Sequence, residues 1–293
     1  MSDKSLVSSN EVWLAIQQRV RGIQTKSIEI SETGLWHAEE KLSAEAKQLL
    51  NLYAPVVATS KKQSLVVAHL GQSLDGYIST VNGDSHYVNC TENIIHLHRM
   101  RALFDAVLVG ANTVDIDNPT LTTRLVSGDN PVRVVIDPQC RLGPTHTVFT
   151  DDSVPTVLLC AMGSRNNRLS ENNHVEIIGI PATNEGLPVR DCIRALRSRG
   201  LLRLFVEGGG DTVTRFFNEG TLDRLQISVA PTIFGSGRPG LCLPPTPTAQ
   251  EAFRPKHCSH FQLGDDILFD FELKKNLVQQ EGPHELGQAH KSV

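Results

Sequence analysis

The sequence predicts an α/β protein in which a mostly parallel central sheet is flanked by helices, with an antiparallel pair of strands at the C-terminal end and a helical N-terminal extension. Three observations lead to this class: short apolar runs recur from residue 64 onward, helix-like stretches separate several of them, and the last two strands lack a helix between them. Runs that are apolar on both faces are typical of strands in a parallel sheet that is covered on both sides. The runs are SLVVAHL (64–70), DAVLVGA (105–111), VRVVID (132–137), TVLLCA (156–161), VEIIGI (175–180) and LRLFVEG (202–208).

The first 60 residues are predicted to be helical. Val12, Trp13, Ile16 and Val20 recur at near-helical spacing, and SAEAKQLLNLYAPVV begins with the Ser/Glu pattern of a capping box. We expect residues 1–60 to form an appended helical segment, residues 61–275 to form the α/β domain, and residues 276–293 to be a flexible tail without a periodic apolar face.

Helices are expected between the strands, and the chain is expected to end differently. ENIIHLHRMRALF (92–104) and LPVRDCIRALRSRG (187–200) have helical patterns, and the second ends on a glycine where a C-cap is expected. DRLQISVAPTIFG and DDILFDFELKK then indicate two strands, which predict an antiparallel finish to the sheet.

Composition excludes several classes of protein. With 28 Lys+Arg against 32 Asp+Glu, the formal charge of −4 gives no general electrostatic attraction to nucleic acid or to an anionic membrane. No run approaches the roughly 18 apolar residues of a membrane span, and MSDKSLVSSNE lacks the apolar stretch of a signal peptide, so we expect a cytoplasmic protein. The six cysteines show no CxxC pair, which disfavours a disulfide framework or a zinc knuckle.

A phosphate site is predicted where an apolar run passes into three glycines. In VEGGGDTVTRFF (206–217), Gly208, Gly209 and Gly210 allow a tight turn and a close approach of the backbone to a ligand, and Gly209 is expected to adopt a positive φ. The helix expected next presents free N–H groups and its positive dipole end to an anion. A plain tight turn is the alternative, because the motif is neither a complete GxGxxG fingerprint nor a Walker loop.

Two further segments carry polar side chains where predicted strands end. HLGQSLDGYISTVNGDSHYV (69–88) leaves a strand and enters a loop dense in Ser, Gly, Asp and Asn, and RMRALFDAVLVGANTVDIDNPTLTTR (99–124) opens at Gly110 into a second polar segment. Arg99, Arg101 and Arg124 can together supply a local positive site, because guanidinium groups fit phosphate oxygens. Solvated surface arginines are the alternative.

The order of these motifs, SLDG, GDSxY, RxRAxxDAVLVGAxTVxxDNPxLTTR, RVVID and VEGGG, resembles the pyrimidine reductase family of riboflavin biosynthesis over roughly residues 64–273. The resemblance implies a dihydrofolate-reductase-like fold, NADPH as cofactor and a homodimer. It also implies reduction of the ribosyl group of 5-amino-6-(5-phosphoribosylamino)uracil to the ribityl form, by hydride transfer to the sugar C1′ after ring opening.

The resemblance also assigns residues to the two sides of the site. The substrate side comprises Ser85, Arg101, Leu121, Arg124 and Glu207. The cofactor side comprises Gly71, Tyr87, Thr113 and Asp117, together with a pyrophosphate turn that contains Gly208, Gly209, Gly210, Asp211, Thr212 and Arg215. The phosphate site predicted from the glycines agrees with this assignment.

Two positions depart from the family pattern. His69 stands where the family commonly has a lysine that contacts the pyrimidine; histidine still donates a hydrogen bond but is shorter and mostly neutral near pH 7. Pro138 stands where the family often has a Ser or Thr hydroxyl near the cofactor. Arg141 in the same loop is our candidate for contacting the 2′-phosphate of NADPH, with a solvated loop arginine as the alternative.

Glu207 is the candidate for a catalytic acid, because it directly precedes the phosphate turn, whereas Asp75 in SLDG is first of all a turn residue. His37 and Glu39 match the H-x-E of a zinc deaminase, but the P-C-x-x-C partner is missing. We therefore interpret them as polar residues at a helix start and predict no metal.

Three hypotheses about function follow. The first is an NADPH-dependent pyrimidine reductase that acts on a phosphorylated small molecule without nucleic acid or membrane partners. The second is a reductase of the same fold for a pterin-like or another phosphorylated substrate, which His69 motivates. The third is a non-catalytic ligand-binding protein. The presence of both cofactor-side and phosphate-side residues favours an enzyme.

Overall fold

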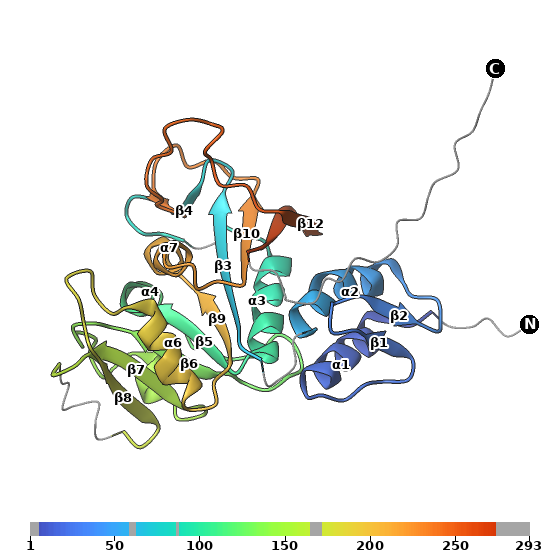
Figure 1. Ribbon diagram of the computed structural model, residues 1–293, viewed down its shortest axis with the longest axis horizontal. Coiled ribbons are helices and arrows are strands. Elements are labelled where there is room, and N and C mark those ends of the chain that lie inside the picture. Colours follow the sequence, from blue (N-terminus) through green and yellow to red (C-terminus); the bar gives the residue numbers. More distant parts are fainter. Residues whose placement is uncertain (1–5, 59–62, 86–87, 165–171, 274–293) are drawn as a thin grey trace, which may run out of the picture.

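The computed structural model describes residues 6–58, 63–85, 88–164 and 172–273, and its centre is a nine-stranded sheet (Figure 1). The strands are β3 (Leu65–Ser73), β5 (Ala106–Gly110), β6 (Val132–Ile136), β7 (Thr156–Ala161), β8 (Val175–Ile180), β9 (Arg203–Glu207), β10 (Arg224–Ala230), β12 (His257–Leu263) and β13 (Asp266–Glu272). Their order across the sheet is β12-β13-β10-β3-β9-β5-β6-β7-β8. The strands from β10 to β8 run parallel, so the predicted α/β class with a mostly parallel sheet is confirmed.

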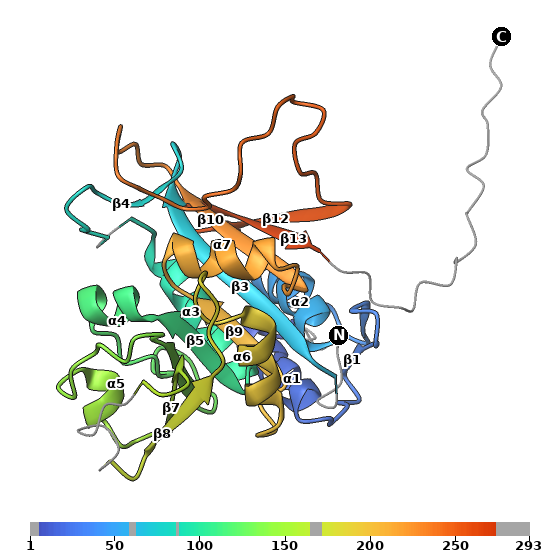
Figure 2. The same cartoon turned by 60° about the vertical axis from the view of Figure 1, so that its left-hand side comes forward.

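Helices cover both faces of the sheet and form two separate cores. α3 (Thr91–Leu103), α4 (Ala111–Asp117) and α5 (Thr147–Thr150) contribute to one core, and α6 (Val189–Arg197) and α7 (Gly210–Asn218) contribute to the other, where Figure 2 shows them in front of the sheet. Along β3, Val67 packs into the first core while Val66 and Ala68 pack into the second. This alternation explains why the strand is apolar on both faces.

The N-terminal extension contains α1 (Ser9–Val20), β1 (Ile28–Ile30), β2 (Trp36–Ala38) and α2 (Ala44–Val57). The prediction of a purely helical segment was wrong, because β1 and β2 form an antiparallel hairpin whose turn uses Gly34 at φ 82°. His37 and Glu39 were expected at a helix start, but His37 lies in β2 and Glu39 directly follows it, both exposed.

The complete capping box lies on α1 rather than on α2. The Ser8 hydroxyl accepts from the backbone N–H of Glu11, whose carboxylate accepts from the N–H of Ser8. At α2, Ser43 caps the N–H of Ala46, while Glu45 stands one position too early to complete a box.

Arg203 ties the extension to the sheet. This fully buried β9 side chain donates from Nε to the carbonyl of Leu103 at 3.0 Å and from Nη2 to the carbonyl of Val56 at 3.0 Å. Its guanidinium lies 5.0 Å from the ring centre of Phe104, and burial lowers its pKa to about 10. α2 therefore packs as part of the same core as α3, and the boundary near residue 60 stays a prediction.

The antiparallel finish is confirmed by the pairing of β10 with β13. β12, which pairs with β13 at the edge of the sheet, was not predicted. Five of its seven residues are exposed, so the strand lacks the apolar pattern by which a strand is predicted. The predicted flexible tail, residues 276–293, lies outside the described residues. Within the described ranges, no helix is long and apolar enough to cross a membrane.

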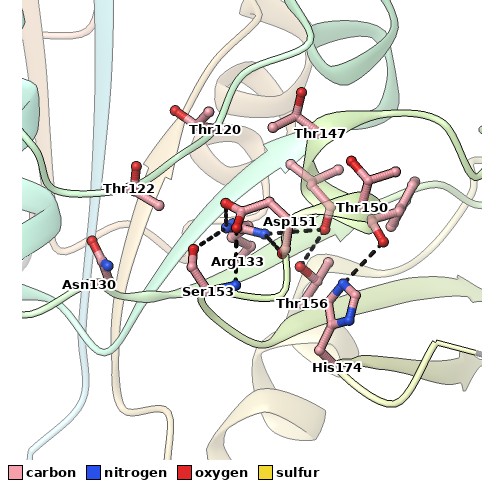
Figure 3. Close-up of polar contacts among 12 residues, drawn as sticks. Thr120, Thr122, Asn130, Arg133, Thr147, Thr150, Asp151, Ser153, Thr156 and His174 are labelled. Carbon is pink, nitrogen blue, oxygen red and sulfur yellow. Dashed lines mark hydrogen bonds and ion pairs between the residues drawn. The ribbon is translucent and has the colours of Figure 1, made fainter.

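A buried arginine on β6 holds the segment that leads into β7 (Figure 3). Arg133 pairs with the Asp151 carboxylate and donates from Nη1 to the Asp151 carbonyl at 2.7 Å. Burial lowers the pKa of Arg133, and the Asp151 carboxylate opposes that shift. Beside this pair, the Thr156 hydroxyl donates to the carbonyl of Val148 at 2.6 Å.

Candidate active site

A cleft of about 750 Å³ opens at the carboxyl ends of β3, β9 and β5, which are neighbours in the sheet. Parallel strands end at one edge, so polar residues that follow each strand meet there. This explains how loops that are far apart in the sequence form one site. The predicted residues that line the cleft are His69, Gly71, Ser85, Arg101, Thr113, Asp117, Leu121, Glu207, Gly208, Gly209, Gly210 and Asp211.

A second cleft of about 410 Å³ adjoins the first and shares Asn112, Thr113, Gly209 and Asp211 with it. It is lined by three more of the predicted residues, Arg141, Thr212 and Arg215. Arg141 contacts Asp115 at 3.1 Å and Asn112 at 2.5 Å, and Arg215 donates to the carbonyl of Leu187 at 2.5 Å. The predicted cofactor residues therefore extend across both clefts.

Three predicted residues are not placed in either cleft. Arg99, expected to contribute to a local positive site, lies instead against the extension, with its guanidinium 5.7 Å from the centre of the Trp13 ring. The Arg124 side chain is exposed and donates to the Thr120 hydroxyl at 2.6 Å, three residues from the cleft residue Leu121. Tyr87 lies outside the described residues. Arg124 and Tyr87 remain predictions as site residues.

The glycine turn uses its three residues differently from the prediction. Gly208 has the positive φ, 133°, whereas Gly209 is the N-cap of α7 at φ −56°, so the expectation for Gly209 was wrong. The N–H of Gly209 donates to the Thr113 hydroxyl at 3.2 Å, which fixes the turn against α4. A Cβ on Gly210 would lie 1.9 Å from the carbonyl oxygen of Gly240. Gly208 is thus required for its conformation and Gly210 for a close backbone contact.

This difference predicts unequal effects of two matched substitutions. Gly210→Ala is expected to lower the free energy of unfolding by about 2 kcal/mol, because backbone must move to admit the methyl group. Gly209→Ala is expected to cost about 1 kcal/mol or less, because its Cβ would meet only the Thr113 hydroxyl at 3.6 Å. Urea denaturation of both variants measures the difference, and equal losses would contradict it.

Arg101 and Glu207 form a buried ion pair in the cleft wall. Nε of Arg101 donates to Oε1 of Glu207 at 2.9 Å and Nη2 donates to Oε2 at 2.5 Å, while Nη1 donates to the carbonyl of Thr122 at 3.1 Å. The two side chains are about 9% and 10% exposed. α3 and β9 position them, so this pair joins the helix to the strand that leads into the glycine turn.

His69 lines the cleft as a buried, neutral side chain. Desolvation and the neighbouring His96 lower its pKa to about 3, so the imidazole carries no charge near pH 7. Its Nε2 lies 3.1 Å from Oδ1 of Asn93 on α3, and Nε2 donates because an amide oxygen only accepts. The cleft wall therefore presents a neutral group at this position.

Sequence reasoning missed several polar residues of the cleft. Asn89 lies just before α3 and Asn93 lies on it. Arg238 comes from β11 (Arg238–Pro239), which pairs with β4 (Tyr77–Ser79). A Cβ on Gly71 would lie 1.9 Å from Oδ1 of Asn89, which shows how closely this side chain packs on β3. For Asn89 the available signal was its position directly after the polar segment 69–88, whereas Asn93 within the predicted helix 92–104 and Arg238 had none.

The fold and these clefts define the class of protein as an α/β ligand-binding domain, with its site at the carboxyl edge of a mostly parallel sheet. The chain belongs to the RibD C-terminal domain family, whose model matches residues 64–269, and the predicted resemblance is confirmed. The match begins after the extension.

Relatives of known name agree with this membership. The chain is 30% identical over 215 residues to the 2,5-diamino-6-ribosylamino-4(3H)-pyrimidinone 5′-phosphate reductase of Methanothermobacter thermautotrophicus, covering 71% of this chain and 98% of that protein. It is 29% identical over 179 residues to riboflavin biosynthesis protein RibD of Aquifex aeolicus, covering 61% of this chain and 49% of that protein. The chain therefore spans about half of that RibD.

Solved structures show the shared fold. A deaminase/reductase from Thermotoga maritima is 24% identical with a TM-score of 0.59, covering 80% of this chain and 64% of that one. RibD from Acinetobacter baumannii is 21% identical with a TM-score of 0.63, and the match covers 78% of this chain and 62% of that one. The predicted dihydrofolate-reductase-like architecture is thus confirmed.

Proposed function

We propose that this chain is a riboflavin-pathway reductase that uses NADPH to reduce the ribosyl group of 5-amino-6-(5-phosphoribosylamino)uracil to the ribityl form. The observation that carries this proposal is that the glycine turn and the Arg101–Glu207 pair line one cleft of a RibD C-terminal domain. The names of the relatives support a reductase of this pathway.

A second substrate is favoured by one comparison. The Methanothermobacter relative, which the chain matches over nearly its whole length, is named for the 2,5-diamino pyrimidinone rather than for the uracil. The two compounds differ at one ring position, so the same cleft is a candidate site for either.

The two adjoining clefts fit an extended dinucleotide. α7 begins at Gly210, and the backbone N–H groups of Gly210 and Asp211 have no hydrogen-bond partner within the part of the chain that the structure describes. Free N–H groups at a helix start suit the pyrophosphate. Arg141 and Arg215 in the second cleft offer guanidinium groups for the far end of the cofactor. When bound, NADPH supplies the hydride.

Glu207, which was predicted from the sequence as a catalytic acid, is better placed to orient a neighbouring side chain. Both of its carboxylate oxygens accept charge-assisted hydrogen bonds from Arg101, so both oxygens are already engaged by the guanidinium. We propose that Glu207 orients Arg101 toward the substrate, and that the cleft aligns the sugar C1′ with the cofactor and excludes water.

Following NADPH absorbance with purified protein tests the proposed function. Oxidation with the uracil substrate, the diamino pyrimidinone or both supports a pyrimidine reductase and ranks the two. Oxidation with a pterin substrate alone would support the other reductase hypothesis. Calorimetric binding of these ligands without any turnover would support a non-catalytic protein.

Arg141→Ala is expected to reduce the preference for NADPH over NADH. A lost charge-assisted contact costs about 1.5–3 kcal/mol, or roughly 10- to 150-fold. The kcat/KM for NADPH should fall while that for NADH is spared. Arg190→Ala is the matched control, because Arg190 lies on α6 outside the second cleft. An unchanged cofactor ratio in the Arg141 variant would exclude this residue from the site.

Arg124→Ala is expected to weaken substrate binding far more than NADPH binding, by about 1.5–3 kcal/mol if its guanidinium contacts the phosphate. Titration calorimetry with each ligand measures both affinities. If the variant lost affinity for NADPH alone, Arg124 would belong to the cofactor side of the site rather than to the substrate side.

The proposed enzyme is a cytoplasmic homodimer. β12 supports the dimer, because it is an edge strand that pairs only with β13 among the described strands, and an edge strand can pair with a second copy. Light scattering of the purified protein measures its mass.

A further inference from the structure

A buried polar network joins the N-terminal extension to the wall of the cleft. The Tyr53 hydroxyl on α2 lies 2.7 Å from Nδ1 of His96 on α3, and Nε2 of His96 lies 2.9 Å from Oε1 of Gln226 on β10. All three residues are fully buried. The guanidinium of Arg99 lies 6.0 Å from the centre of the Tyr53 ring.

The hydrogen-bond directions in this network follow from the acceptors. Because Oε1 of Gln226 only accepts, Nε2 of His96 donates, and Nδ1 of His96 must accept the Tyr53 proton. Desolvation lowers the pKa of His96 to about 4 and raises the pKa of Tyr53, so both groups stay neutral near pH 7. Gln226 therefore determines which nitrogen of His96 carries the proton, and the Tyr53 hydroxyl donates to the other nitrogen.

The network also fixes α3 on the sheet. Asn93 and His96 lie three residues apart on α3 and bond to His69 and Gln226, which are register partners on adjacent strands. The rings of His69 and His96 lie 5.5 Å apart between centroids. The same helix carries four cleft residues, Asn93, Ile94, Leu97 and Arg101, so any shift of α3 changes the shape of the cleft.

We propose that Tyr53 and His96 are positioning residues for the reaction, which hold α3 and the imidazole of His69 in the arrangement that binds the substrate. This inference rests on the proposed function. It makes the N-terminal extension, which lies outside the matched family region, a part of the machinery of the active site. His69 has no partner for Nδ1 within the described ranges, so this atom is available to accept an N–H of the substrate.

Tyr53→Phe tests the proposal with the smallest change, because it removes one hydroxyl and keeps the ring. The kcat/KM for the pyrimidine substrate is expected to fall roughly tenfold, while the dissociation constant for NADPH changes by less than about twofold. Trp36→Phe is the matched control, since it removes a hydrogen bond to Asn51 that stays within the extension. Equal kinetics in the two variants would overturn the proposal.

A second readout does not depend on turnover. Long-range ¹H–¹⁵N spectra of histidine-labelled protein distinguish the two imidazole tautomers, and His69→Gln and His96→Gln identify the signals. In the unmodified protein both rings are expected to carry the proton on Nε2, and Tyr53→Phe is expected to alter the signals of both. An unchanged His69 signal would overturn the proposal. A protein that oxidises no NADPH with any pyrimidine would refute only the proposed function.

Discussion

Arg101→Met is expected to lower the free energy of unfolding by about 3–4 kcal/mol and to abolish turnover of the pyrimidine substrate. The substitution keeps most of the side-chain volume but leaves the Glu207 carboxylate buried without its cation, and breaking a buried ion pair from one side carries a cost of this size. Turnover is lost because the cleft wall loses the guanidinium that we assign to the substrate. Urea denaturation and NADPH oxidation measure the two effects.

The double variant Arg101→Met, Glu207→Leu separates stability from activity. Replacing both charges with apolar groups removes the unpaired carboxylate, so most of the lost stability is expected to return while the enzyme stays inactive. Recovery of turnover in the double variant would show that the pair only supports the fold. A single variant with unchanged stability would show that water already screens the pair.

Lowering the pH from 7 to 5 is expected to reduce the free energy of unfolding by about 4 kcal/mol through His69 and His96 together. Their folded-state pKa values, about 3 and about 4, lie below the unfolded value of 6.5, so the unfolded chain binds more protons in this range. The stability is fully present above pH 6.5 and is lost as the pH falls toward the folded values. His98, a buried residue whose pKa is lowered to about 4 mainly by desolvation, adds to the same loss.

Urea denaturation between pH 7 and 5 measures this slope. The double variant His69→Gln, His96→Gln should remove most of it, whereas His257→Gln, an exposed residue on β12, should leave it unchanged. The same slope in all three proteins would assign the pH dependence to other groups.

Local patterns predicted much of the architecture. Apolar runs determined β3, β5, β6, β7, β8 and β9, because a strand buried on both faces leaves a contiguous hydrophobic signal. β12 left no such signal, since an edge strand exposes most of its side chains. β1 and β2 were missed because three-residue strands are shorter than the pattern that reveals them.

The sequence by itself determined the fold class, the glycine turn and twelve of the residues that line the larger cleft, because each belongs to a contiguous motif. Tertiary structure alone decided which partners these residues have. The bidentate contact of Arg101 with Glu207 and the hydrogen bond of Tyr53 with His96 join residues 106 and 43 positions apart. Such contacts depend on how α2, α3 and β9 pack against one another, and no local spacing encodes that packing. For the same physical reason, the positive φ fell on Gly208 rather than on Gly209: the contacts of Thr113 and Gly240 with the turn set its geometry.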